Sequence, residues 1–227
     1  MARRWWLIPI VGIGGALLYR ELRRSGHLRM PVKGLETGKV PNPVAYDTAY
    51  SWILDGLYTK LALEIVDSGP TGRVLDVGCG PGRLDVRLGV MVPSLEVIGV
   101  DIDPIMVDLA AAHARDAGVS GRVHFQVGDS EAMPFEDGEF DMVVSSLSLH
   151  HWADPARAMS EIHRVLRPGG EVRIYDVPDR IRQFIHGGGS MLEMAQASPF
   201  EWGLVDTFRW PGPIPSLRCL RMRKPRG

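Results

Sequence analysis

The chain alternates between short apolar runs and longer segments whose apolar residues recur at helical spacing. Residues 44–67 carry apolar groups at helical spacing from Trp52 to Ile65, which predicts one or two helices. Five short apolar runs bounded by turn residues then predict buried strands, at residues 74–77, 97–100, 123–127, 142–144 and 172–175. A further helix is predicted from Gly82 to about residue 90.

Two more helices begin with an aspartate followed by proline. Asp103-Pro104 and Asp154-Pro155 each combine an N-cap side chain with a residue whose fixed φ suits the first helical position. Gly118 is expected to end the first of these helices and Pro168-Gly169-Gly170 the second. Near the C-terminus, residues 203–210 and 217–222 predict a hairpin around the turn-rich PGPIP.

This order of elements predicts an α/β fold with a doubly wound, mainly parallel sheet of seven strands and a C-terminal antiparallel hairpin. Sheets of this kind bind their ligands beyond the carboxyl ends of the strands. Residues that directly follow the predicted strands are therefore the first candidates for a functional site.

The first strand leads into a glycine-rich turn. The stretch VLDVGCGPGRL places Gly78, Gly80 and Gly82 at alternate positions after a strand that contains Asp76. Bare backbone lets a ligand approach closely and meet free N–H groups. The dinucleotide fingerprint G-x-G-x-x-G fails because Arg83 occupies its sixth position, and the chain has no Gly-Lys-Ser/Thr phosphate loop.

The pattern D-x-G-x-G-x-G resembles motif I of the class I S-adenosylmethionine-dependent methyltransferases. Other segments between residues 70 and 178 resemble further motifs of that family in the same order; they are VIGVDIDP, VGDSEAMPF, FDMVVSSLSLHHW and RVLRPGG. The chain is most similar to the small-molecule branch called type 11. The resemblance implies a Rossmann-like methyltransferase fold, S-adenosyl-L-methionine as cofactor and a small-molecule methyl acceptor.

The resemblance also implies cofactor contacts at the strand ends. Asp101 is expected to accept from the ribose hydroxyls, and Asp129 from the adenine amino group, with the Ser130 backbone beside it. Asp76 is expected to orient the glycine turn near the cofactor ammonium, and the Ser145 backbone to meet the methionine end. The predicted cofactor-binding set is completed by Gly78, Cys79, Gly80, Gly82 and Ile102.

Several of these residues have simpler alternative roles. Asp103 is interpreted mainly as a helix cap, while Asp129 could close a turn. Gly82 could serve helix packing alone, and Cys79 is interpreted as a small turn residue rather than a nucleophile.

His150 and His151 follow the fourth strand and are the candidate catalytic residues. Methyl transfer from a sulfonium depends mainly on alignment, and a general base is needed only if the acceptor must lose a proton. The alternative is a structural segment with one histidine packed and one exposed. No metal site is predicted, because adjacent histidines do not share a helical face as an i, i+4 pair does. Residues 182–190, with three successive glycines, are expected to form a flexible loop or the hinge of a lid.

Composition fits one sizeable folded domain with extra segments. The two cysteines, Cys79 and Cys219, lie far apart and form neither a disulfide framework nor a metal-ligand spacing. Residues 1–40 carry a net charge of +6 and residues 218–227 one of +5, which leaves −12 for the rest of the chain. An acidic body argues against nucleic acid as a partner, while basic ends suit an anionic membrane surface.

The N-terminal segment predicts membrane association. Residues 5–19 contain no charge, are flanked by arginines and would span about 22 Å as a helix, short of the roughly 30 Å hydrocarbon core. We expect an anchor at residues 1–24, a linker at 25–43 and a methyltransferase domain at 44–227. A cleaved signal peptide and a buried core helix are the alternatives. The denser positive charge after the segment predicts that the domain lies on the cytoplasmic side.

Two other functions are compatible with parts of the pattern. A catalytically silent, membrane-tethered module could keep the cofactor fold without turnover. An NAD(P)-dependent oxidoreductase is the third candidate, and Arg83 argues against it. If the anchor is present, a lipophilic methyl acceptor becomes the favoured hypothesis.

Overall fold

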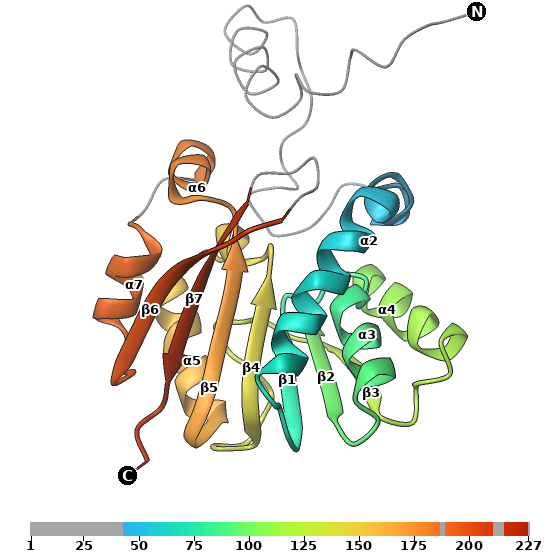
Figure 1. Ribbon diagram of the computed structural model, residues 1–227, viewed down its shortest axis with the longest axis horizontal. Helices are drawn as coiled ribbons and strands as arrows, with labels where there is room; N and C mark the ends of the chain where they lie inside the picture. The colour runs from blue at the N-terminus through green and yellow to red at the C-terminus, as the bar shows by residue number, and fades with distance from the viewer. Residues whose placement is uncertain (1–42, 187–188, 211–215, 227) are drawn as a thin grey trace, which may run out of the picture.

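A computed structural model describes residues 43–186, 189–210 and 216–226, which form a seven-stranded sheet flanked by helices (Figure 1). The strands are β1 (Arg73–Val77), β2 (Glu96–Asp101), β3 (Val123–Val127), β4 (Phe140–Ser146), β5 (Leu166–Asp176), β6 (Trp202–Phe208) and β7 (Leu217–Arg223). Their order is β3-β2-β1-β4-β5-β7-β6. The first five run parallel, whereas β7 runs antiparallel to both β5 and β6. The predicted fold class is confirmed.

Helices cover both faces of the sheet, so that the domain has three layers (Figure 1). The helices are α2 (Pro43–Asp67), α3 (Arg83–Met91), α4 (Pro104–Asp116), α5 (Pro155–Val165), α6 (Asp179–His186) and α7 (Met191–Ala197), with a 3-10 turn η2 (Leu149–His151). Successive strand residues point to opposite faces. Val74 therefore packs in the core under α2 and α3, whereas Leu75 packs in the core under α5 and α7.

The expected helix starts are present. Asp103 caps α4 by accepting a hydrogen bond from the backbone N–H of Ile105. Asp154 caps α5 by accepting from the N–H groups of Ala156 and Arg157. Both helices begin one residue after the aspartate, with proline in the first turn, as the sequence predicted.

Two expectations about helix and loop boundaries are wrong. Helix α5 ends at Val165, and Pro168-Gly169-Gly170 belongs to β5 rather than to a helix stop. The reason is a register shift opposite Phe140 and Met142, where Gly169 adopts a φ of 77° and lets the strand continue past the irregularity.

The expected loop at residues 182–190 is also replaced in part by helix. Residues 182–186 belong to α6, and Ser190 caps α7 in a capping box with Glu193. The S-x-x-E spacing is visible in the sequence and is typical of such a helix start. Gly187 and Gly188 of the expected hinge lie outside the described residues.

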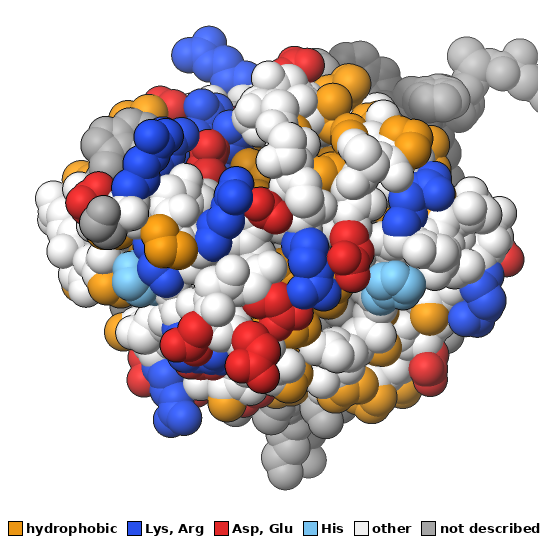
Figure 2. Space-filling view, turned by 90° about the horizontal axis from the view of Figure 1, so that it is seen from below, with side chains coloured by type: hydrophobic (Ala, Val, Ile, Leu, Met, Phe, Trp, Pro, Cys, Tyr) orange, Lys and Arg blue, Asp and Glu red, His pale blue; other side chains and the backbone are white. Residues whose placement is uncertain are grey.

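Charges of both signs are mixed on the side of the molecule where β1 begins (Figure 2). Arg73 pairs there with Glu96 and Glu139, and Arg167 pairs with Asp141. These ion pairs connect the loops at the amino ends of the strands. The polar groups considered below gather instead at the carboxyl ends.

The predicted anchor at residues 5–19 and nearly all of the linker lie outside the described part of the chain. None of the described helices has the length and apolar character that crossing a membrane requires.

Helix α2 owes its position to one fully buried stripe, formed by Leu57, Leu61 and Ile65. Truncation of Leu61 to alanine should lower the free energy of unfolding by about 2–5 kcal/mol, because it removes buried contacts and leaves a cavity. Leu63→Ala on the same helix is the control, since Leu63 is 49% exposed and should change stability by less than about 0.5 kcal/mol. Chemical denaturation monitored by circular dichroism measures both, and equal losses would contradict the packing of α2.

Candidate active site

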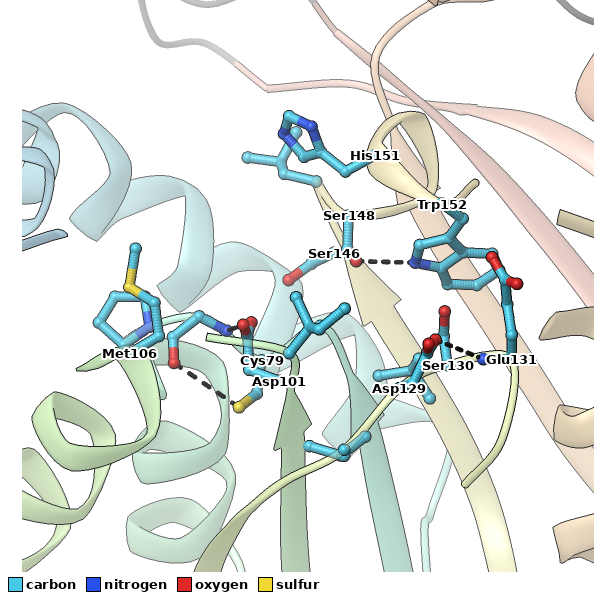
Figure 3. Close-up of a pocket in the computed structure, with 18 of the residues that line it drawn as sticks. Cys79, Asp101, Met106, Asp129, Ser130, Glu131, Ser146, Ser148, His151 and Trp152 are labelled. Atoms are coloured by element: carbon cyan, nitrogen blue, oxygen red, sulfur yellow. Dashed lines mark hydrogen bonds between the residues drawn. The ribbon is translucent and has the colours of Figure 1, made fainter. Parts of the chain in front are cut away.

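A pocket opens at the carboxyl ends of the parallel strands, where ligands of such sheets bind (Figure 3). Its wall is formed by the segments that follow β1, β2, β3 and β4, together with Tyr58 from α2. Asp101 and Asp129 lie on two sides of the pocket, and His151 lies at its upper end in the view of Figure 3. The lining includes the predicted residues Gly78, Cys79, Gly80, Asp101, Ile102, Asp129, Ser130 and His151.

The glycine turn brings backbone to the pocket without side chains. Gly80 adopts a φ of 54°, and a Cβ atom added there would meet nothing within 4 Å, so this position faces open space. Gly78 serves a different purpose, because a Cβ atom there would lie 1.8 Å from the Ser148 Oγ. Gly82 does not line the pocket; its missing side chain makes room for Phe125 and Ala110, as expected for a packing role.

Asp101 holds this turn in place from the tip of β2. Its Oδ2 accepts a hydrogen bond from the Gly80 N–H at 2.8 Å, and its Oδ1 accepts from the Asp103 N–H at 2.9 Å. Burial raises the pKa of Asp101, and the N–H groups of Asp103 and Gly80 oppose that rise. A carboxylate oxygen has two lone pairs, so each oxygen can still accept from a ligand hydroxyl group.

Asp129 lies across the pocket after β3. Its Oδ1 accepts from the Glu131 N–H at 2.9 Å, so the aspartate closes a turn as the alternative interpretation proposed. Because the residue also lines the pocket beside Ser130, turn closure and ligand contact are compatible.

Asp76 and Ser145 lie behind the pocket rather than in its wall. Asp76 is completely buried, and the Ser145 Oγ donates to the Val77 carbonyl at 2.8 Å. Ser146 and Ser148, which the sequence analysis did not single out, line the pocket instead of Ser145. Side chains alternate along β4, so a shift of one residue decides which serine reaches the ligand side.

Asp76 forms a buried acidic pair with Asp85 from the first turn of α3. Neither residue is exposed, and no oxygen of either carboxyl group has a hydrogen-bond donor among the described residues. Two carboxylates cannot donate to each other, so a hydrogen bond between them requires a shared proton. Burial and the charge of Asp85 raise the pKa of Asp76 well above its usual value, and burial raises the pKa of Asp85 to about 7.

The two candidate catalytic histidines occupy different positions. His151 lines the pocket, whereas His150 lies behind it with Nδ1 2.7 Å from Oδ1 of the buried Asp176. Their ring centroids lie 4.0 Å apart, and the ring planes are tilted by 43°. Both side chains are partly buried, so the alternative of one packed and one exposed histidine is not what the structure contains.

Several residues in or behind the wall were not singled out in the sequence analysis, although Leu147 and Trp152 lie within the FDMVVSSLSLHHW segment. Tyr58 comes from the helix before the sheet, and Trp152 donates from Nε1 to the Ser148 Oγ at 2.9 Å. Leu147 lines the pocket with a φ of 54°, unusual for a residue with a side chain. Asp176 could have been noted as a polar residue at the tip of β5.

The chemistry of the wall fits S-adenosylmethionine. Among the described residues that line the pocket, the charged ones are Asp101, Asp129 and Glu131, and none is lysine or arginine. A ligand with ribose hydroxyls, cationic groups and no phosphate is matched by acceptors of this kind. A phosphate-bearing dinucleotide would instead meet like charge.

Comparison with known proteins agrees with this geometry. Residues 75–174 match the type 11 family described as "Methyltransferase domain". The chain is 32% identical over 124 residues to the ubiquinone/menaquinone biosynthesis C-methyltransferase UbiE of a Geobacter species, covering 54% of this chain and 53% of that protein. It is 37% identical over 121 residues to demethylmenaquinone methyltransferase of Thermus thermophilus, covering 53% and 54%. The chain thus spans about half the length of these curated relatives.

Solved structures share the fold. A putative O-methyltransferase from Nostoc punctiforme superposes with a TM-score of 0.68 at 20% identity, over 80% of this chain and 60% of that one. The YcgJ protein of Bacillus subtilis gives a TM-score of 0.59 at 22% identity, over 74% and 99%. The family match over residues 75–174 agrees with the predicted family and with S-adenosyl-L-methionine as the predicted cofactor.

Asp101→Asn should weaken binding of the cofactor product S-adenosylhomocysteine by about 1.5–3 kcal/mol, because a charge-assisted acceptor is lost and the Gly80 turn is loosened. Titration calorimetry measures this as a rise in Kd of roughly 10- to 150-fold. The matched control is Asp108→Asn, an exposed aspartate on α4, which should leave Kd unchanged. Equal affinity of wild type and Asp101→Asn would remove Asp101 from the binding site.

Asp85→Asn should stabilise the protein at alkaline pH. The raised pKa means that folded Asp85 holds its proton at pH values where the unfolded chain has lost it, so wild-type stability falls as pH rises towards 7. The asparagine amide cannot ionise and can donate to Asp76, so the gain should reach about 1–3 kcal/mol near pH 8.5 and be smaller near pH 5.

Thermal and chemical denaturation at both pH values provide the measurement for Asp85→Asn. The exposed Asp116→Asn serves as the control and should show no such pH dependence. A stability difference between wild type and Asp85→Asn that is the same at both pH values would contradict the shared proton.

Proposed function

Because the chain carries a class I S-adenosylmethionine-dependent methyltransferase domain, we propose that it transfers a methyl group to a small lipophilic acceptor at a membrane surface. The observation that carries the proposal is the pocket at the sheet edge, where Gly80 offers open backbone beside the carboxylates of Asp101 and Asp129. When bound, S-adenosylmethionine supplies an electrophilic methyl group on a positively charged sulfur.

The residues of the chain divide into two groups by their place in the pocket. Asp101, Ile102, Asp129 and Ser130 would hold the nucleoside, with hydroxyl and amino groups as their partners. The glycine turn, with Ser146 and Ser148 opposite it, would hold the amino-acid end. Alignment of this kind can account for about 7–11 kcal/mol of the barrier to a two-reactant step.

Apolar and aromatic groups form the remaining wall, which is where an acceptor would approach. Tyr58 from α2 lines the pocket together with Leu147 and Trp152, which flank η2 and His151. A wall of this composition excludes water and favours an acceptor with an apolar ring or chain. This supports the lipophilic class.

The position of α2 supports delivery from a membrane. Its first turn lies on the same side of the molecule as the carboxyl ends of β4 and β5 (Figure 1). If residues 5–19 associate with a bilayer, as their apolar sequence and flanking arginines suggest, the pocket edge would face that bilayer on its cytoplasmic side. The named substrates of the UbiE and demethylmenaquinone relatives make quinol rings a natural first panel of acceptors.

Incubation of the full-length protein with methyl-labelled S-adenosylmethionine and cell extracts should place label in the lipid fraction. Asp101→Asn should reduce the initial rate at limiting cofactor by at least about tenfold, while Asp108→Asn should not. Mass spectrometry of the labelled fraction identifies the acceptor.

The other outcomes separate the competing functions. Label confined to the aqueous fraction would contradict the lipophilic class but keep the transferase. Tight cofactor binding without label in any fraction would indicate the silent, membrane-tethered module. A thermal shift with NAD(P)H alone would favour the oxidoreductase.

A further inference from the structure

A buried carboxylate behind the pocket is linked to it through two histidines. Asp176 ends β5 and is completely buried. It accepts three hydrogen bonds, from the His150 N–H at 2.8 Å, from His150 Nδ1 at 2.7 Å and from the Val177 N–H at 2.6 Å. The two backbone donors are enough to fix the η2 turn, and any residue at position 150 would supply the first of them. The turn therefore does not require the third hydrogen bond, which comes from the His150 imidazole.

The contact with Asp176 determines the tautomer of His150. A carboxylate only accepts, so Nδ1 of His150 carries a proton and Nε2 is the acceptor nitrogen of the neutral ring. The ring is therefore fixed in orientation and in protonation pattern by a group that cannot move within the sheet.

His151 extends this arrangement into the pocket. Its ring lies against the ring of His150, with a centroid distance of 4.0 Å and the two planes tilted by 43°. It lines the pocket together with Leu147 and Ser148. Two imidazolium rings at this distance would repel, whereas one positive charge is balanced by Asp176. A positive charge gained at His151 would therefore have the Asp176 carboxylate on the far side of the His150 ring.

We propose that His151 is the catalytic base of the methyl transfer and that His150 and Asp176 are positioning residues that fix its ring and balance its charge. The inference rests on the proposed function and narrows its substrate class. The acceptor carries a proton that must leave, as in a phenol, an enol or a ring C–H, rather than an amine or thioether that is already nucleophilic.

The proton balance of this step is simple. The acceptor X–H bond breaks, its electron pair forms the new X–CH₃ bond, and His151 gains the proton to become an imidazolium. The proton passes to solvent when product leaves. The S–CH₃ bond of the donor would break at the same time, and its electron pair would stay on sulfur and leave a neutral thioether.

Other ionisable groups near the cluster are fixed by their own contacts or lie across the pocket. Helix α6 packs against η2, and its Arg182 pairs with Asp179 at 3.5 Å. Tyr58 faces the pocket from α2 and Glu131 faces it from beyond β3. Asp176 is the carboxylate that contacts the His150 ring, at 2.7 Å from Nδ1.

Nuclear magnetic resonance of histidine-labelled protein tests the arrangement without turnover. With S-adenosylhomocysteine bound, His150 should show a protonated Nδ1 with a strongly downfield proton. In Asp176→Asn that signal should disappear, and the titration midpoint of His151 should move to lower pH because the balancing charge is gone. An Nε2–H tautomer of His150, or a His151 midpoint unchanged by the substitution, would overturn the inference.

Kinetics test the role in transfer, using His150→Phe as a variant that keeps both backbone donors to Asp176. With the acceptor identified by the labelling experiment, His151→Asn should lower kcat by about 10²- to 10⁴-fold. His150→Phe should lower kcat by at least about tenfold while the KM for S-adenosylmethionine stays within about twofold. His163→Phe on α5 is the matched control, because His163 packs on Phe200 away from the pocket.

The outcomes distinguish failure of the inference from failure of the proposed function. Methyl transfer by wild type, with kcat of His151→Asn and His150→Phe within about threefold of it, overturns the inference and leaves the function standing. Cofactor binding without transfer to any extract defeats the proposed function, and the Asp176→Asn titration then decides whether the positioning cluster exists.

Discussion

The hydrogen bond from the Gly80 N–H to Asp101 is the contact on which the site depends. It joins the turn after β1 to the tip of the adjacent strand β2, so that the loops after these two strands form one surface. A glycine turn without such an anchor would have many conformations, because glycine restricts its own backbone least. With the anchor, free backbone and a carboxylate are presented together. The same residue thus shapes the pocket and supplies an acceptor to it.

A second constraint comes from acids that are buried rather than presented. Asp76 and Asp85 lie beneath the turn without donors among the described residues, which is costly for ionised groups and demands a proton. Asp176 differs from this pair, because it is equally buried but accepts three hydrogen bonds. The buried carboxyl groups of this domain therefore differ in the number of hydrogen-bond donors around them. Burial alone does not distinguish them; the number of donors does.

Most of the fold could be predicted from the sequence because its signals are local. The Asp-Pro caps of α4 and α5 depend on residues next to each other, and each buried strand has its own apolar run. The boundary at Leu166 could not be predicted, because the strand passes through Pro168-Gly169-Gly170 only by pairing with β4. Tertiary pairing overrode a strong local signal there.

The site also has one part that local sequence signals predict and another part that depends on tertiary structure. The residues proposed to hold the cofactor follow strand ends in sequence order, so the positions of Asp101, Asp129, Gly78 and Gly80 at the pocket could be predicted before any coordinates. A strand end locates such residues only to within about one position: Ser145 was predicted, and the neighbouring Ser146 lines the pocket. The acceptor half is assembled from α2, η2 and the end of β5, which no single motif spans. Tyr58 lines the pocket there, and Asp176 lies buried behind it against His150.

This division has a consequence for how the activity can vary among proteins that share the fold. The glycine turn is fixed by backbone geometry, because Gly78 and Gly80 both have positive φ angles that strain other residues, and a Cβ atom at Gly78 would also clash with Ser148. The acceptor half is made of side chains on separate elements, and each can change without disturbing β1 or β2. Similarity concentrated in residues 75–174 therefore speaks for the shared methyl donor. The acceptor has to be inferred from Tyr58, His151 and Trp152, because those are the groups it would touch.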